Sequence, residues 1–525
     1  MEKTILKICM EKGFLLDKEM LNLLSGLDEE SAKKLIESIV SLKFEEKVIT
    51  KTFFSKNLQK IQEVLIDGKN KTVIENLFFN LGYSRTEIEQ KEVRKEEKVE
   101  LIEEKQGKVK LLSVSFVPPK KVCVADFVKH YRTRYEQIKK ILLERNLDNL
   151  TSLRKIGDKK ENYTIIASVF DKRITKNKNL LLNVEDSSGR ARILINANKK
   201  EVFDKAKDLL LDDIVAFQVS GNKEWLYAND VIFPDCVLHE KKKYEKDEWV
   251  AFSSDAHIGS TMFLEENFKK FLEWLNGERG DEKQKEIAKK VKYLFLVGDC
   301  IDGVGVYPDQ ERFLNIKNIK DQYNKLSEFL RYLRKDIKII LSPGQHDGVR
   351  VAEPQPIVEE SWAPELHKIE NLTLVPNPAL VEIDGGFKIL MYHGASMHSI
   401  IDEIEDIRLN YKSNSPTRVV KEMLKRRHLA PTHSSVTYIP NEKEDPLLIT
   451  QIPDIVATGD LHRPEISIYN NILLIASSCW QSITPFEEKV GNHPDPCKVP
   501  LFNLKTREIK IIDFGDTKED KGEEK

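Results

Sequence analysis

The chain has 525 residues, and its 84 Lys and Arg residues nearly balance its 86 Asp and Glu residues, which leaves a net charge of −2. A chain of this length has room for about three domains, and its hydrophobic content of 40% is sufficient for buried cores. The charge balance excludes a general attraction to nucleic-acid phosphates, so any DNA binding would depend on local patches or on a partner subunit.

The cysteines and the N-terminus indicate the cellular compartment. Six cysteines are scattered without a Cys-x-x-Cys pair, which argues against a zinc ribbon or a disulfide framework and for reduced thiols. The first residues, MEKTILKICMEKGF, contain no long apolar segment, and no run approaches the length of a membrane span. We therefore expect a cytoplasmic protein without membrane association.

Residues 1–86 form the first predicted module. From Met1 to about Leu65 apolar residues recur at helical spacing, as in Leu35, Ile36 and Ile39. This predicts a small helical module, either for docking to a partner protein or for stability. Residues 87–120 are almost continuously charged, which is typical of a solvated linker or an exposed helix.

Residues 121–245 combine a helix with strand-like segments. The predicted helix, residues 125–145, interleaves Tyr and Arg, and we favour packing over DNA contact for it. Strand-like runs follow from Tyr163, with a helical stretch at 199–210, and this order fits a five-stranded OB-fold barrel. OB folds stack bases on aromatic side chains above a basic groove. The candidate residues are Phe170, Trp225 and Tyr227 for bases and Arg173, Lys176, Lys178, Arg190 and Arg192 for phosphates; packing against another domain or chain is an equally weighted alternative.

Residues 246–516 contain five apolar, strand-like runs that each end in potential metal ligands. The runs are WVAFSSDAHIG, YLFLVGD, IKIILSPGQHD, FKILMYHG and DIVATGDLH. Strand ends are where α/β sheets place ligands. Carboxylate and imidazole groups suit Mn, Fe, Zn or Mg, and a shared carboxylate can bridge two ions. A lone His or Asp at a strand end is more often a cap, but five such ends favour one shared centre.

The order of these groups resembles the calcineurin-like metallophosphoesterase superfamily, whose pattern is D-x-H, G-D-x-x-D, G-N-H-[DE], H, G-H-x-H. Longer strings are similar to the small subunits of archaeal family D DNA polymerases. They are GDCIDGVGVYPDQ (298–310), PGQHDGVRVAEPQP (343–356), RRHLAP (426–431) and KVPLFNLKTREIKIIDF (498–514). The resemblance covers roughly the last 400 residues.

This resemblance implies an αββα sandwich that holds two divalent metal ions. One ion would be bound by Asp255, His257, Asp299 and His462, and the other by Asp299, Gln345, His393 and Asp460. His346 would lie beside the scissile phosphate, with Asp347 as its orienting partner. Gln345 and Asp460 replace the usual Asn and His, and the added oxygen ligand favours Mn or Mg over Zn. We expect Mn, with Mg, Fe or Zn as alternatives.

Basic residues near this pattern are candidate phosphate contacts. Arg350 could reach a DNA phosphate, although a surface salt bridge is nearly as good an interpretation. Arg426, Arg427 and His428 form a basic cluster that we interpret as a phosphate or partner contact. Residues 517–525 are a charged tail.

The resemblance implies a 3′-to-5′ exonuclease that proofreads single-stranded or mismatched DNA ends, with polymerisation on a large catalytic subunit. The alternative is a non-catalytic accessory subunit that scaffolds the large subunit and DNA. A small-molecule or protein phosphatase shares the metal pattern but does not explain the barrel or the longer strings. A sliding clamp or another replication protein is a candidate partner of the N-terminal module, although we find no convincing clamp motif.

Overall fold

The computed structural model describes residues 15–16, 48–49, 109–112 and 121–516. The chain divides into two compact units, Met1–Ile102 and Glu103–Lys525. In the first unit, β1 (Leu15–Leu16) pairs in parallel with β2 (Val48–Ile49). The rest of the predicted helical module, most of the predicted linker and the tail 517–525 lie outside the described residues. No helix of the described part is long and apolar enough to cross a membrane.

The first long helix, α8 (Val124–Leu143), confirms the helix predicted at 125–145. Its buried residues, His130, Arg134, Ile138 and Leu142, recur every four positions and therefore share one face. The Nε of Arg134 donates to the carboxylate of Asp445 over 2.5 Å, and both side chains are buried. The helix therefore packs into the molecule, as we expected.

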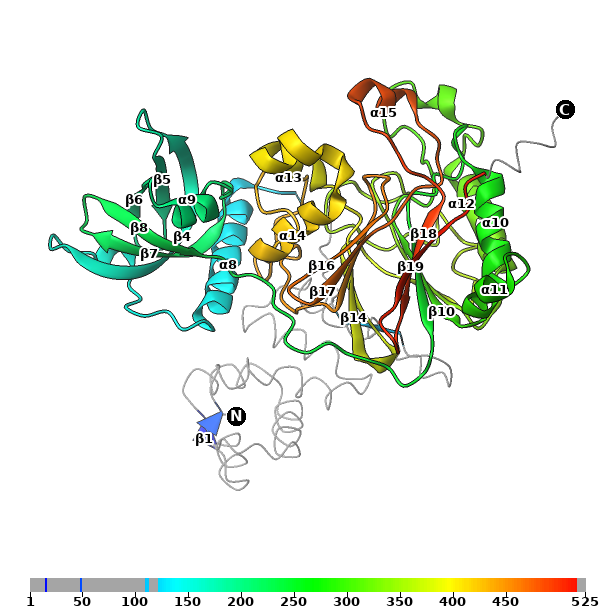
Figure 1. The fold of residues 1–525 in the computed structure, drawn as a ribbon, viewed down its shortest axis with the longest axis horizontal. Coiled ribbons are helices and arrows are strands. Elements are labelled where there is room, and N and C mark those ends of the chain that lie inside the picture. Colours follow the sequence, from blue (N-terminus) through cyan, green and yellow to red (C-terminus); the bar gives the residue numbers. More distant parts are fainter. Residues whose placement is uncertain (1–14, 17–47, 50–108, 113–120, 517–525) are drawn as a thin grey trace, which may run out of the picture. The chain divides into compact units, whose positions relative to one another are not determined.

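A closed five-stranded barrel follows (Figure 1). Its strands are β4 (Glu161–Ile174), β5 (Leu180–Glu185), β6 (Arg190–Ile195), β7 (Ile214–Gly221) and β8 (Leu226–Ile232), in the spatial order β4-β5-β6-β8-β7. The helix α9 (Lys200–Ala206) connects β6 to β7. The turn between β5 and β6 forms because the side chain of Asp186 accepts hydrogen bonds from the backbone N–H groups of Ser188 and Gly189.

Two six-stranded sheets form the rest of the described chain (Figure 1). In the first sheet the order is β12 (Leu372–Leu374), β11 (Lys338–Ser342), β10 (Val291–Val297), β9 (Trp249–Ser253), β18 (Lys498–Asn503) and β19 (Ile509–Asp513). In the second the order is β16 (Glu465–Tyr469), β17 (Ile472–Ala476), β15 (Ile455–Thr458), β14 (Phe387–Met391), β13 (Ala379–Ile383) and β3 (Lys110–Leu111). Residues 110 and 111 of the predicted linker pair with β13 at the edge of this sheet, where Lys110 is exposed and Leu111 is partly buried.

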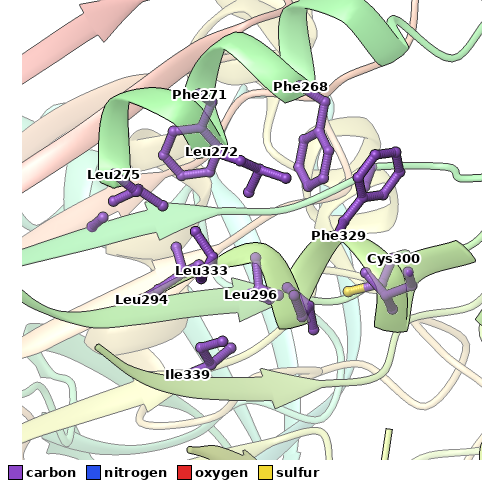
Figure 2. Close-up of a cluster of buried hydrophobic side chains, with 14 of the residues drawn as sticks. Phe268, Phe271, Leu272, Leu275, Leu294, Leu296, Cys300, Phe329, Leu333 and Ile339 are labelled. Atoms are coloured by element: carbon purple, nitrogen blue, oxygen red, sulfur yellow. The ribbon is translucent and has the colours of Figure 1, made fainter. Parts of the chain in front are cut away.

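The sheets pack face to face, and helices cover their outer faces. Alternate residues of β9 point in opposite directions: Val250 and Phe252 face the second sheet, whereas Trp249 and Ala251 join the core beneath the helices. That helical layer consists of α10 (Glu265–Leu275), α11 (Glu282–Lys289) and α12 (Ile319–Tyr332). Figure 2 shows Phe268, Phe271 and Leu272 of α10 above Leu294 and Leu296 of β10.

The outer face of the second sheet is covered by α13 (Met397–Glu403) and α14 (Pro416–Arg426). A further helix, α15 (Pro485–Val490), precedes β18. The remaining short turns are η1 (Leu153–Lys155), η2 (Gln310–Phe313), η3 (Asp384–Gly386), η4 (Ile407–Tyr411) and η5 (Lys412–Asn414). The predicted α/β class with a preceding five-stranded barrel is therefore present. Strands buried on both faces explain the continuous apolar runs in the sequence.

The basic cluster predicted to meet phosphate or a partner is buried instead. Arg426 pairs with Asp213 of the barrel over 3.0 Å and with Glu422 of its own helix over 2.5 Å. Arg427 donates to backbone carbonyl groups, and His428 pairs with Asp445. That prediction is wrong, because all three side chains are buried: Arg426 links α14 to the barrel, Arg427 binds carbonyl groups of the sheet domain, and burial lowers the pKa of His428 to about 4.

Candidate metal centre

The seven predicted metal ligands come together at the carboxyl ends of five strands. In the first sheet, Asp255 and His257 follow β9, Asp299 follows β10, and Gln345 follows β11, and these three strands are parallel. In the second, His393 follows β14, while Asp460 and His462 follow β15, which runs parallel to β14. Parallel strands present their carboxyl ends at one edge of a sheet.

Asp255, His257 and His462 form the first group. Each offers a ligand atom within 4.8 Å of the others, and all three residues are buried. The Nε2 atoms of the two histidines are 3.2 Å apart, and the Nε2 of His462 lies 3.3 Å from Asp255 Oδ1. The structure therefore places these three side chains as the resemblance implied for one ion.

The other ring nitrogen of each histidine faces a carboxylate. The Nδ1 of His257 lies 3.1 Å from Asp302 Oδ1, and the Nδ1 of His462 lies 2.8 Å from Glu487 Oε1. We infer that each Nδ1 carries the proton, which directs both Nε2 lone pairs toward each other and toward Asp255. Such an arrangement is repulsive unless a cation or a proton lies between these atoms.

A second group joins Asp255, Asp299 and His393. His393 Nδ1 lies 2.8 Å from the carbonyl oxygen of Val297, and its Nε2 lies 3.1 Å from Asp299 Oδ2. Burial lowers the pKa of His393, but Asp299 and Asp255 outweigh it and raise that pKa well above its ordinary value. The centre thus favours positive charge at this position.

Gln345 and Asp460, the two residues that depart from the superfamily pattern, lie beside this second group. Gln345 Nε2 donates to Asp460 Oδ1 over 2.9 Å, and Asp460 Oδ1 lies 3.9 Å from His393 Nε2. Two buried oxygen atoms here have no hydrogen-bond partner: Gln345 Oε1 and Asp460 Oδ2. Buried polar atoms are rarely left unsatisfied, so these orphaned acceptors, together with the carboxylate and imidazole donor set, fit divalent cations.

The backbone at this centre adopts an uncommon conformation. Five of the seven candidate ligands have positive φ: 51° at Asp255, 49° at His257, 49° at Asp299, 68° at Asp460 and 55° at His462. Residues other than glycine rarely adopt this region, and such residues cluster at functional sites.

Comparison with known proteins identifies the family. A model of the B-subunit family of DNA polymerases alpha and epsilon matches residues 250–467. The DNA polymerase II small subunit of Archaeoglobus fulgidus is 34% identical over 451 residues, which cover 85% of this chain and 89% of that protein. The corresponding subunit of Methanothermobacter thermautotrophicus is 33% identical over 395 residues, which cover 74% of this chain and 80% of that protein. The chain belongs to the DNA polymerase II small subunit family. A solved archaeal phosphodiesterase is 16% identical to this chain. The match covers 50% of this chain and 98% of that protein, with a TM-score of 0.25.

In this member of the small subunit family, Asp302 orients His346, the candidate proton donor. The ring Nδ1 of His346 lies 2.8 Å from the backbone carbonyl of Asp302. Asp347, expected in this role, instead accepts hydrogen bonds from the backbone N–H groups of Cys300 and Gly344 and from Tyr323. Burial, followed by the charge of Asp299, raises the pKa of Asp347 to about 7.

Sequence reasoning did not single out Asp302 or Glu487. Asp302 occupies the last position of the G-D-x-x-D pattern, so the pattern itself offered a way to find it. Glu487 accepts hydrogen bonds from Thr484 at the start of α15 as well as facing His462. Nothing in the local sequence distinguishes it from an ordinary helix cap.

Arg350 lines one cavity together with Gln345 and His346. The guanidinium of Arg350 is half-buried and donates to the carbonyl oxygens of Ala352 and Pro354. On the barrel, Arg190 lies over the ring of Phe170 at 4.7 Å, and Arg192 lies over the ring of Trp225 at 4.3 Å. Tyr227 is also exposed, by 45%, and Arg190 pairs with Glu185 over 2.9 Å.

Proposed function

We propose that this small subunit is a metal-dependent 3′-to-5′ exonuclease that removes nucleotides from single-stranded or mismatched DNA ends. The observation that carries the proposal is the geometry of the centre. Imidazole lone pairs and carboxylates face inward there, so the site is stabilised by positive charge, and it lies beside His346. The relatives are small subunits of DNA polymerase II, which supports a large polymerase subunit as partner. A replication enzyme of this kind would act in the cytoplasm, beside the archaeal chromosome.

The expected ions are two, with Mn favoured because Asp460 places an anionic oxygen where the superfamily pattern has an imidazole nitrogen. When bound, divalent ions would polarise the phosphate and lower the pKa of bound water. Asp255, His257, Asp299 and His462 would hold one ion, and Asp299, Gln345, His393 and Asp460 would hold the other. His346 is positioned by Asp302 and keeps its other ring nitrogen for donating a proton to the leaving oxygen.

The exposed aromatic and basic residues of the barrel support a role in delivering single-stranded DNA to the centre. We infer that it is an OB fold and that Phe170, Trp225 and Tyr227 stack bases while Arg190 and Arg192 neutralise phosphates. Local positive charge of this kind is what a chain with a net charge of −2 needs for DNA binding. Arg350 is a further candidate phosphate contact. A sliding clamp or another replication protein stays a candidate partner.

The experiment follows a 3′-mismatched oligonucleotide with the purified chain and Mn. We expect nucleotide release by the wild type and losses of about 100-fold or more in Asp299→Asn and His346→Ala. Asp309→Asn and His239→Ala remove an exposed carboxylate and an exposed imidazole elsewhere, and should leave the rate unchanged.

The second candidate function is a non-catalytic accessory subunit. One observation favours it: Gln345 Nε2 donates to Asp460 Oδ1 over 2.9 Å, so one oxygen of a candidate ligand of the second ion already accepts a hydrogen bond. An inactive wild type, alone and with its large subunit, would establish this role and refute the exonuclease. Equal rates of nucleotide release in the wild type, Asp299→Asn and His346→Ala would likewise refute the exonuclease.

A further inference from the structure

A cavity of about 630 Å³ lies beside His346. Its wall is built from the loop after β10, the start of α12 and the segment after β11. The lining residues include Val304, Val306, Gln345, His346, Val351, Ile357 and Trp362. Sites for small organic ligands range from about 300 to 1,000 Å³. The cavity is therefore large enough for one nucleotide and its hydration.

Apolar side chains are left open to solvent around this cavity. Val304 is 41% exposed, Val306 40%, Val351 62%, Ile357 42% and Trp362 42%. An exposed cluster of apolar side chains in a folded protein marks a binding surface. The most extended flat surface among them is the indole of Trp362.

The polar side of the same cavity adjoins the candidate metal centre. Gln345 and His346 line the cavity, and the backbone N–H of His346 donates to Asp299 Oδ1 over 2.9 Å. A ligand that places an anionic group at the centre would therefore extend its next group along the apolar wall. A nucleotide has this layout, since its phosphate is joined through a sugar to a flat, largely apolar base.

We propose that this cavity binds the base of the 3′-terminal nucleotide, with Trp362 as its stacking surface. The assignment rests on the proposed function, which places the phosphate of that nucleotide at the centre. An apolar wall accepts any base, because every base has a stacking face, and an exonuclease that removes any mismatch needs this tolerance. A side chain of a partner protein in the same cavity would cover His346 and block the centre.

The test compares a ligand that has a base with one that lacks it. Calorimetry with the full chain and Mn measures the affinity for deoxyadenosine 5′-monophosphate and for 2-deoxyribose 5-phosphate. We expect the wild type to bind the first about tenfold more tightly, and Trp362→Ala to abolish this preference without changing the affinity for the base-free ligand. Ile357→Ala should reduce the preference less.

Controls separate this proposal from loss of folding. Ile468→Ala removes another exposed apolar side chain, 60% exposed, from β16, and should change neither affinity. Thermal unfolding of each variant checks that the fold is intact; because Trp362 and Ile357 are exposed, we expect unchanged midpoints.

Each outcome assigns failure to one proposal. Equal wild-type affinity for the two ligands overturns the base site, even if the exonuclease is active. If Trp362 provides a preference for the ligand with a base but the protein degrades no DNA, the base site is supported and only the exonuclease is refuted. If Trp362→Ala keeps the preference but no longer binds the large subunit, the cavity is a partner site and the proposal is wrong.

Discussion

At the scale of single residues, Asp302 holds two histidines of the centre through different atoms. Its carboxylate faces His257 Nδ1 at 3.1 Å, and its backbone carbonyl faces His346 Nδ1 at 2.8 Å. Carboxylates that orient a metal-binding histidine contribute about 10- to 100-fold to metal affinity. The substitution Asp302→Asn keeps the backbone carbonyl but removes the charge.

We therefore expect Asp302→Asn to weaken Mn binding about 10- to 100-fold, measured by calorimetric titration. His346 should keep its position, because its partner is a backbone atom. The matched control, Asp309→Asn, lies at an exposed position in the same loop region. An Mn affinity in Asp302→Asn equal to that of the control would contradict this orienting role.

A second residue-scale prediction concerns Glu353, which is 1% exposed and hydrogen-bonded by Tyr392. Burial raises the pKa of Glu353 to about 8 from its ordinary value of 4.5. The folded protein therefore keeps a proton that the unfolded chain releases between these two values. The free energy of unfolding should fall as pH rises from about 4.5 to about 8, by up to about 1.4 kcal/mol per pH unit from this group.

Glu353→Gln should remove this contribution, because the amide resembles the protonated acid and does not titrate. Denaturant unfolding in chelator at pH 5 to 8 should show the variant gaining stability relative to the wild type as pH rises. Glu360→Gln, at an exposed position, is the control and should follow the wild type. Parallel curves for all three proteins would show that Glu353 is ionised in the fold.

At the scale of elements, the loops that follow the strands depend on glycine. Gly298, directly after β10, has φ +82°, and a Cβ there would lie 2.3 Å from His393 Nδ1. Gly386, before β14, has φ +70° but no atom within 4 Å of such a Cβ. An alanine at either position meets the same backbone penalty of about 1–2 kcal/mol, whereas only Gly298→Ala also collides with a candidate ligand.

We expect Gly386→Ala to lose about 1–2 kcal/mol of stability in urea unfolding, and Gly298→Ala to lose more. Only Gly298→Ala should also lose Mn affinity, because His393 must move away from Val297 and Asp299. Equal Mn affinity in the two variants would mean that the position of His393 is unimportant for the centre.

At the scale of the whole molecule, buried ion pairs join the barrel to the sheets. Arg426 of α14 is 3% exposed and pairs with Asp213, which precedes β7 and is also 3% exposed. Removing one partner of a buried pair leaves an uncompensated charge and costs about 3–5 kcal/mol. Arg426→Met should therefore destabilise the protein by about this amount in urea unfolding.

An exposed ion pair provides the comparison for Arg426. Arg312 lies 3.4 Å from Asp309, and the two side chains are 73% and 66% exposed. Arg312→Met should change stability by less than about 1 kcal/mol. If Arg426→Met were equally mild, the contact between barrel and sheets would not depend on this pair.

Much of the fold follows from local patterns in the sequence. The helix at α8, the five barrel strands and the five strands that end in candidate ligands were all predictable, because side-chain periodicity is set by near neighbours. The order of Asp255, Asp299, His393 and Asp460 along the chain also indicated one centre, since parallel strands align their carboxyl ends.

The tertiary structure alone decided which groups meet across the chain. Asp302 and His257 are 45 positions apart, and Glu487 and His462 are 25 apart, so their pairing depends on packing. The same holds for Arg426, whose charge predicts a phosphate contact but whose partner in the fold is Asp213. It holds also for Trp362, because no sequence pattern indicates that its side chain is exposed beside His346. Periodicity specifies which way a side chain faces within its element, but the partner on that face is set by how the elements pack.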